Sequence, residues 1–114
     1  MFDELNKYKK NGHFFFRPDD QLTKVSNVPK DFIGIYLIYA LERGRINLVY
    51  TGTVLPSGQW APKMLLENIE ALDVYWYVTN DKRKVIAPKD AEAEILEVYQ
   101  SIYGILPRWN LRTS

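Results

Sequence analysis

The sequence contains no cysteine and only one histidine, His13. The absence of cysteine excludes disulfides, zinc sites with thiolate ligands and a cysteine nucleophile. A single histidine excludes a metal cage built from several histidines. Any catalytic metal would therefore have to rest on carboxylates and water.

Long apolar runs are also missing. No segment approaches the roughly 20 residues that a membrane-spanning helix needs. Residues 1–10 are charged, and no apolar stretch of a signal peptide follows them. We therefore expect a cytoplasmic protein that has no contact with a membrane.

The chain lacks a strong charge of either sign, because 15 Lys and Arg residues stand against 14 Asp and Glu residues. A net charge of +1 gives no general support for nucleic-acid binding, which usually shows as a basic surface. Short basic clusters still allow a local basic face, although each cluster is also typical of a solvated surface. These clusters are Lys7, Lys9 and Lys10, then residues 82–84, then Arg108 and Arg112.

A length of 114 residues and a hydrophobic content of 46% suit one domain with a real core. Residues 1–28 are polar and irregular, so we expect an N-terminal arm packed on a domain that spans 29–114. Within the arm, Phe14–Phe16 suits a strand or a packed segment, since Gly12 and Pro18 bound it.

A β-hairpin is expected first in the domain. The segment 32–41 is apolar at both odd and even positions, which is typical of a central strand covered on both faces. A turn at 42–45 and a returning strand at 46–52 follow. Two prolines and a glycine make 53–62 a loop.

Two helices and one more strand complete the expected fold. A short helix after Pro62 is indicated by the apolar row of Leu65, Ile69 and Leu72, and a third strand by the segment 73–79. The last helix should run over 89–103 and end at Gly104. This order predicts an α+β fold, a small antiparallel three-stranded sheet flanked by helices, with an N-terminal extension.

Two tripeptides on the two arms of the hairpin carry a resemblance. Gly34-Ile35-Tyr36 and Tyr50-Thr51-Gly52 resemble the paired motifs of the GIY-YIG nuclease domain family, with Thr51 in place of the usual isoleucine. A helix bearing glutamate and a Pro-x-x-Asn ending follow in the family's order. The resemblance covers 29–111 and implies an endonuclease that hydrolyses DNA phosphodiester bonds.

The resemblance implies roles for particular residues. Tyr36 would hold or deprotonate the attacking water, Tyr50 would lie in the same pocket, and Asn110 would close the site by hydrogen bonding. Glu92, followed by apolar residues three and four positions later, corresponds to the family's metal ligand for one Mg²⁺ or Mn²⁺ ion. Glu94 is the other candidate, although helical geometry places it on a more polar face.

The chain also lacks one group of the family's active site. The helix after the second motif should carry an arginine that contacts the scissile phosphate, yet no arginine occurs between Arg45 and Arg83. Lys63 is the cation nearest to the place of the missing arginine. Arg43 and Arg45 are the other candidates to replace that arginine. Further contacts to substrate are expected from the motif glycines and one lysine before the first strand: Gly34, Gly52 and Lys30.

Two classes of function follow. The first is a metal-dependent endonuclease in which Lys63, Arg43 or Arg45 replaces the missing arginine. The second is a catalytically inactive relative that binds DNA or a protein partner. The near-neutral charge favours the second class, and the set formed by Tyr36, Tyr50, Glu92 and Asn110 favours the first. A homodimer is also open.

Overall fold

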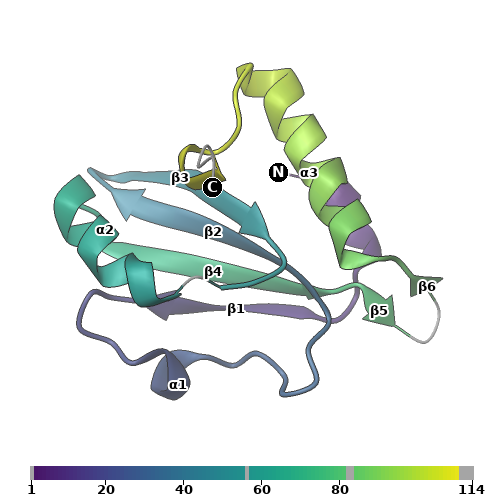
Figure 1. The fold of residues 1–114 in the computed structure, drawn as a ribbon, viewed down its shortest axis with the longest axis horizontal. Helices are drawn as coiled ribbons and strands as arrows, with labels where there is room; N and C mark the ends of the chain where they lie inside the picture. Colours follow the sequence, from purple (N-terminus) through teal and green to yellow (C-terminus); the bar gives the residue numbers. More distant parts are fainter. Residues whose placement is uncertain (1, 56, 82–83, 111–114) are drawn as a thin grey trace.

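A computed structural model of the chain describes residues 2–55, 57–81 and 84–110. Its main sheet has four antiparallel strands in the order β1-β4-β2-β3. Along the chain these strands are β1 (Asn11–Phe16), β2 (Gly34–Glu42), β3 (Arg45–Gly52) and β4 (Ala71–Val78). The fold is therefore α+β (Figure 1).

The expected sheet of three strands was wrong by one strand. Residues 11–16 of the N-terminal arm form β1, which pairs with β4 from Asn11 opposite Tyr77 to Phe16 opposite Leu72. Phe14 and Phe16 are buried while Phe15 is exposed, so one face of this edge strand covers the core. Pairing with β4 joins segments about 60 residues apart, which no local pattern reveals.

The remaining elements are short, apart from two helices. The helices are α1 (Leu22–Val25), α2 (Trp60–Glu67) and α3 (Pro88–Tyr103). Three 3-10 turns are η1 (Asp3–Lys7), η2 (Ser57–Gln59) and η3 (Arg108–Asn110), and a small hairpin joins β5 (Asn80–Asp81) to β6 (Lys84–Val85). Lys82, Arg83 and Arg112 of the basic clusters lie outside the described residues.

The central strand β2 is buried on both faces, as its composition predicts. Alternate residues enter two separate cores. Tyr36, Ile38 and Ala40 pack with α2, and the core on that side is called the α2 core. Ile35, Leu37 and Tyr39 pack with α3 on the other side, in the α3 core.

The β2–β3 hairpin has the predicted tight turn. Arg43 and Gly44 both have positive φ, 50° and 73°, as the two central residues of a mirror-image hairpin turn require. Farther along, Ile38 pairs with Tyr50 and Tyr39 pairs with Leu48, so Val49 is an extra residue in β3. This β-bulge lets Val49 and Tyr50 both contact the α2 core.

The predicted inner face of the short helix was wrong. Trp60 and Met64 are the buried residues of α2, whereas Leu65 is 71% exposed. The helix ends at Asn68, which has φ 58°, and the Ile69 N–H donates to the Met64 carbonyl at 2.9 Å. Ile69 and Leu72 are buried, but both lie beyond the helix and cannot continue its row.

The last helix matches its prediction closely. Pro88 occupies the first turn of α3, and Gly104 caps the end with φ 74°. Ala91 and Ile95 form its buried face against β2 and β3. Among the described residues, no helix combines the length and the apolar character that crossing a membrane requires.

Substitution of neighbouring residues on α2 tests this burial. We expect Met64→Ala to lower the free energy of unfolding by about 2–5 kcal/mol, because it leaves a cavity in the α2 core. The matched control Leu65→Ala should change it by less than about 0.5 kcal/mol. Chemical denaturation of both variants measures the difference. A larger loss for Leu65→Ala would show that α2 packs through the opposite face.

Candidate functional site

Tyr36 and Tyr50 lie on the same face of neighbouring strands. Tyr36 is opposite Gly52, and Ile38 is opposite Tyr50, so the two tyrosines are diagonal neighbours across β2 and β3. Such positions are separated by about 7–8 Å between backbones, within reach of aromatic side chains. The α2 core includes Tyr36, and Tyr50 packs against it.

Gly52 makes room for this arrangement. A Cβ atom at Gly52 would overlap the hydroxyl and ring of Tyr50, because that side chain lies back over the glycine two residues later. At the start of β2, a Cβ at Gly34 would overlap the backbone carbonyl of Tyr77 on β4. A side chain at Gly34 is therefore blocked by the backbone of β4, whereas a side chain at Gly52 would displace the Tyr50 ring.

The two phenol groups differ in their surroundings. Burial raises the pKa of Tyr36 above its ordinary value, and the ring packs against Phe32 with centroids 4.8 Å apart. Tyr50 is partly exposed, and its hydroxyl donates a hydrogen bond to the Val54 carbonyl at 3.1 Å. In the protein alone, Tyr36 is thus a neutral hydrogen-bonding group at neutral pH.

Asn110 is fixed to the outer edge of β3. Its Oδ1 accepts a hydrogen bond from the Thr51 N–H, and its Nδ2 donates one to the Thr51 carbonyl, both at 2.9 Å. One amide side chain thereby replaces a neighbouring strand at this point of the edge. Asn110 holds the second motif in place from the side.

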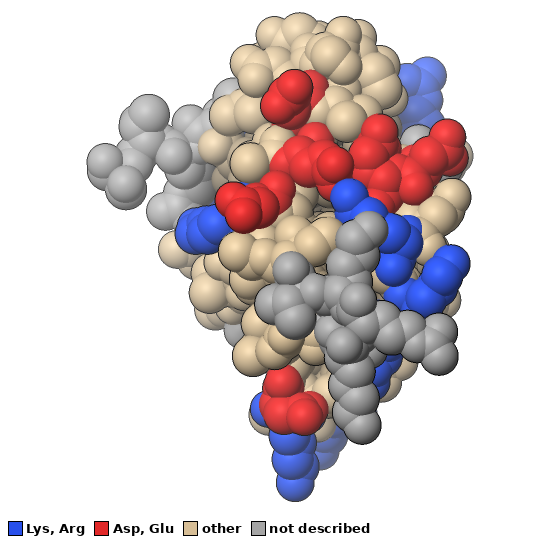
Figure 2. All heavy atoms as spheres, turned by 90° about the vertical axis from the view of Figure 1, so that its right-hand side faces the viewer, with Lys and Arg blue, Asp and Glu red and all other residues tan. Residues whose placement is uncertain are grey.

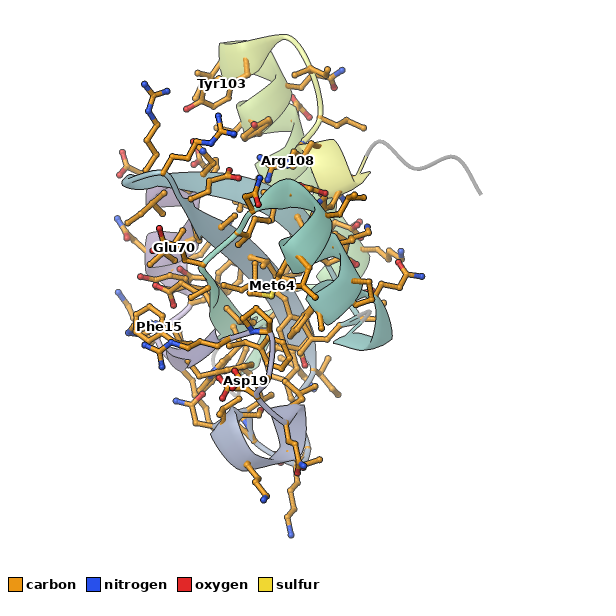
Figure 3. The ribbon with its side chains drawn as sticks, turned by 90° about the vertical axis from the view of Figure 1, so that its left-hand side faces the viewer. Phe15, Asp19, Met64, Glu70, Tyr103 and Arg108 are labelled. Atoms are coloured by element: carbon orange, nitrogen blue, oxygen red, sulfur yellow. The ribbon has the colours of Figure 1, made fainter. Side chains whose placement is uncertain are left out.

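The turn η3 brings further groups to the side of the sheet that α2 covers. Trp109 is buried in the α2 core, and the Lys63 ammonium lies 4.9 Å from the centre of its ring. Arg108 joins the end of β2 to the end of α2, because it donates to both Glu42 oxygens and to Glu67 at 2.8 Å (Figure 3). Its guanidinium lowers the pKa of Glu42.

Glu92 comes from the other side of the sheet. It lies on α3, whose buried residues Ala91 and Ile95 belong to the α3 core. Its side chain is only 17% exposed, and the Lys89 ammonium is 3.5 Å from its Oε1. Glu94 is more exposed and forms a 2.8 Å ion pair with Lys7. Glu92 is thus the more buried of the two carboxylates.

The three basic residues that were expected to contact substrate lie in different parts of the sheet. Arg43 and Arg45 lie at the turn of the hairpin, six or more residues along β2 from Tyr36. At about 3.3 Å per residue this is roughly 20 Å. Lys30 is exposed and precedes β2 by four residues, so it lies nearer the end that contains Tyr36. Lys63 contacts Trp109, which belongs to the same core as Tyr36.

Charges of both signs meet on the surface around α3. Acidic and basic groups lie side by side on this face, without a broad basic area (Figure 2). Among the described residues, no three side chains of His, Asp or Glu come together as a metal site.

Comparison with known proteins identifies no relative. No family model, curated protein or solved structure matches the chain.

Sequence reasoning missed one polar pair. His13 on β1 and Asp73 on β4 form a 2.8 Å contact between Nδ1 and Oδ1, on the side opposite the tyrosine motifs. Asp73 is buried although it is a carboxylate in the middle of a sheet. The sequence did carry a signal for this pair, because Asp73 is a charged residue at the start of an aromatic and β-branched segment.

Removal of the Asn110 amide tests the edge contact. We expect Asn110→Ala to lower the free energy of unfolding by about 1–3 kcal/mol, because the two backbone groups of Thr51 lose their partners. Hydrogen exchange of the Thr51 amide should become faster in this variant. The exposed Gln100→Ala on α3 serves as the control. A Thr51 amide that stays protected in Asn110→Ala would contradict the assignment.

Burial of the Thr51 hydroxyl costs stability. The Thr51 side chain is fully buried, and its hydroxyl has no hydrogen-bond partner among the described residues. We expect Thr51→Val to raise the free energy of unfolding by about 1 kcal/mol, because the shape is kept and the unsatisfied hydroxyl is removed. Thermal unfolding measures the effect. A loss of stability would reveal a bond to that hydroxyl.

Proposed function

We propose that this chain is a GIY-YIG-type endonuclease that hydrolyses DNA phosphodiester bonds with one divalent metal ion. One observation carries the proposal. Tyr36 and Tyr50 lie on one face of the β2–β3 hairpin, and a side chain at Gly52 would displace the Tyr50 ring from its place over that glycine. Core packing needs two apolar residues there, and it does not need two phenols around a glycine.

The two phenols suit different tasks. Hydrolysis needs a water that is held and made nucleophilic close to the phosphate. Tyr50 is the more accessible, so it can hold that water while its own hydroxyl is fixed by the Val54 carbonyl. Tyr36 can accept a proton only after a cation lowers its raised pKa.

Lys63 is the best-placed substitute for the missing arginine. It comes from α2 and lies over Trp109, which belongs to the same core as Tyr36. A lysine supplies positive charge against the developing charge of the phosphorane, but it lacks the planar fork that grips two oxygens. Activity should therefore be low. Arg108 cannot take this role while Glu42 and Glu67 hold it.

Glu92 would hold the metal ion. Its contact with Lys89 is 3.5 Å long, and that lysine is 81% exposed, so the ion pair is easily exchanged. A bound Mg²⁺ or Mn²⁺ supplies a Lewis acid and favours ionisation of water and of nearby phenols. Because α3 lies across the sheet from Tyr36, a metal ion on Glu92 would act on the phenols only if the ion lay at the end of the sheet where β2 begins.

A second function is favoured by what the same residues do in the fold. Both ends of the Asn110 amide are hydrogen-bonded to the Thr51 backbone, and the Tyr50 hydroxyl donates to the Val54 carbonyl. Burial keeps Tyr36 neutral. These are stabilising contacts. A domain that keeps them without the arginine would bind DNA or a protein partner and would cut nothing.

A plasmid-nicking assay with Mg²⁺ or Mn²⁺ separates the two functions. We expect slow nicking that EDTA abolishes, and a loss of about 100-fold or more in Glu92→Gln and in Tyr36→Phe. Lys63→Ala should lose a similar factor, whereas Lys63→Arg should cut faster than the natural chain because it restores the fork. Matched controls are Glu97→Gln and Tyr103→Phe, which alter exposed residues.

The outcomes are distinct. Cleavage that survives both Glu92→Gln and Tyr36→Phe would come from a contaminant and would refute the nuclease proposal. DNA binding at low salt without any cleavage would establish the second function. A chain that neither cuts nor binds DNA would leave a role in protein interaction.

A further inference from the structure

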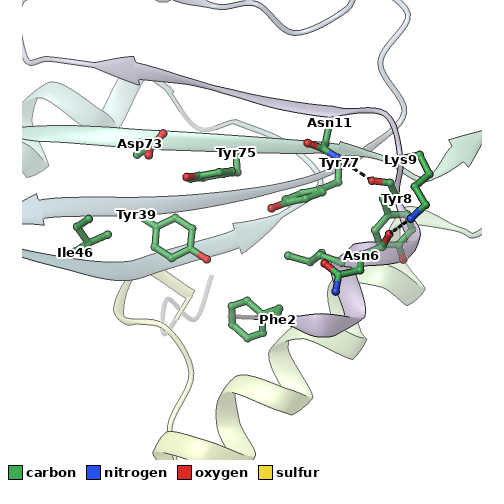
Figure 4. A pocket seen from close by; sticks show the side chains of 11 residues that line it. Phe2, Asn6, Tyr8, Lys9, Asn11, Tyr39, Ile46, Asp73, Tyr75 and Tyr77 are labelled. Carbon is green, nitrogen blue, oxygen red and sulfur yellow. Dashed lines mark hydrogen bonds between the residues drawn. The ribbon is translucent and has the colours of Figure 1, made fainter.

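A cavity of about 550 Å³ opens on the side of the sheet opposite Tyr36 and Tyr50. It lies among η1, β2 and β4, and four tyrosines line it together with one carboxylate and one ammonium group (Figure 4). These residues are Tyr8, Tyr39, Tyr75, Tyr77, Asp73 and Lys9. Its size is within the range of sites for small ligands.

Flat aromatic surfaces form the walls. The rings of Tyr75 and Tyr77 are nearly parallel, with centroids 6.5 Å apart, and Tyr39 meets Tyr75 edge-on at 5.4 Å. Tyr8 lies 6.4 Å from Tyr77. Such rings offer stacking surfaces to a planar ligand, and stacking on them accepts any nucleobase.

Asp73 lies at the inner end of this cavity. It is opposite Tyr39 on β2, in the middle of the sheet, and its side chain is only 12% exposed. His13 contacts Oδ1 at 2.8 Å, and the Tyr75 hydroxyl is also hydrogen-bonded to this carboxylate, so only part of its four or so lone-pair positions remains for a ligand. A buried carboxylate is costly unless hydrogen-bond donors surround it, so this group favours a ligand that donates.

One further group of the cavity lacks a hydrogen-bond partner in the described part of the fold. The Tyr8 hydroxyl is buried, and it has no hydrogen-bond partner among the described residues. Burial, and then the charge on Tyr75 and Asp73, raises the pKa of Tyr77 to about 12. The tyrosines of the cavity therefore stay neutral at neutral pH, and Asp73 supplies the negative charge.

Lys9 lies at the end of the cavity opposite Asp73. It is exposed, and its ammonium donates to the Asn6 carbonyl at 2.9 Å. Figure 4 shows Asp73 and Lys9 at opposite ends, with Tyr75 and Tyr77 between them. The site thus offers an acceptor at one end, aromatic walls, and a cation at the other end. A nucleotide has the matching order of base and phosphate.

We propose that this cavity binds one unpaired guanine nucleotide, with the base against Asp73 and the phosphate at Lys9. Among the four bases, only guanine presents two adjacent donors, N1–H and the 2-amino group, to a carboxylate. Cytosine and adenine each place an acceptor beside their donor, and thymine places its single donor between two carbonyls. A carboxylate that only accepts therefore selects guanine.

The choice of a DNA nucleotide rests on the proposed function. This guanine would be an unpaired base of the strand that is cut. Because it binds on the face of the sheet opposite Tyr36 and Tyr50, it would fix where that strand lies on the domain. Guanine binding itself does not depend on metal or on cleavage, so the two proposals fail separately.

Calorimetric titration of the whole chain with the four deoxynucleoside monophosphates, without metal, tests the site. We expect dGMP to bind at least about 10-fold more tightly than TMP. Asp73→Asn should remove this preference. Lys9→Ala should weaken dGMP but leave deoxyguanosine unchanged, a pattern that a folding defect does not produce. Asp19→Asn and Lys24→Ala, both exposed and remote from the cavity, are the controls.

Several results would overturn the proposal. No saturable binding of dGMP at millimolar concentration excludes a nucleotide site. Equal affinity for all four nucleotides, or a preference for guanine that Asp73→Asn retains, removes Asp73 as the reader of the base. Binding of choline in place of dGMP would show that the tyrosines and Asp73 form a site for an organic cation.

Discussion

Burial of β2 on both faces is the constraint on which the structure depends. A strand between two cores needs a partner on each edge and a covering layer on each face, and the chain supplies β3 and β4 as partners with α2 and α3 as layers. Alternation along the strand then assigns Tyr36 to the α2 core and Leu37 to the α3 core. The face on which each candidate group lies follows from this one strand.

This alternation also explains why the proposed site is assembled from two layers. The tyrosines and Lys63 belong to the side that α2 covers, while Glu92 belongs to the helix on the other side. Asn110 bonds to the β3 edge between them, through both backbone groups of Thr51. The same separation leaves the part of the α3 side next to η1 open, where the tyrosine cavity forms.

Local signals in the sequence predicted the parts of the fold that local physics controls. The hairpin turn at Arg43 and Gly44, the double burial of β2 and the end of α3 at Gly104 follow from turn chemistry, composition and capping. The pairing of β1 with β4 depends on a contact between distant segments, so Phe14–Phe16 alone left it undecided. The face of α2 was mistaken because Trp60 was assigned to the preceding loop and Leu72 to the helix.

The candidate site was predictable only as a set of residues. Two tripeptides placed Tyr36 and Tyr50 on one hairpin, but the role of Gly52, the bulge at Val49 and the edge bond of Asn110 emerge only in three dimensions. The proposed function requires Glu92 and the two phenols to share one metal site. Paramagnetic broadening by Mn²⁺ in NMR spectra tests this requirement. Substoichiometric Mn²⁺ should broaden the ring signals of Tyr36 and Tyr50 together with Glu92, and Glu92→Gln should abolish the effect. Broadening confined to α3, with both tyrosine rings unaffected, would contradict it.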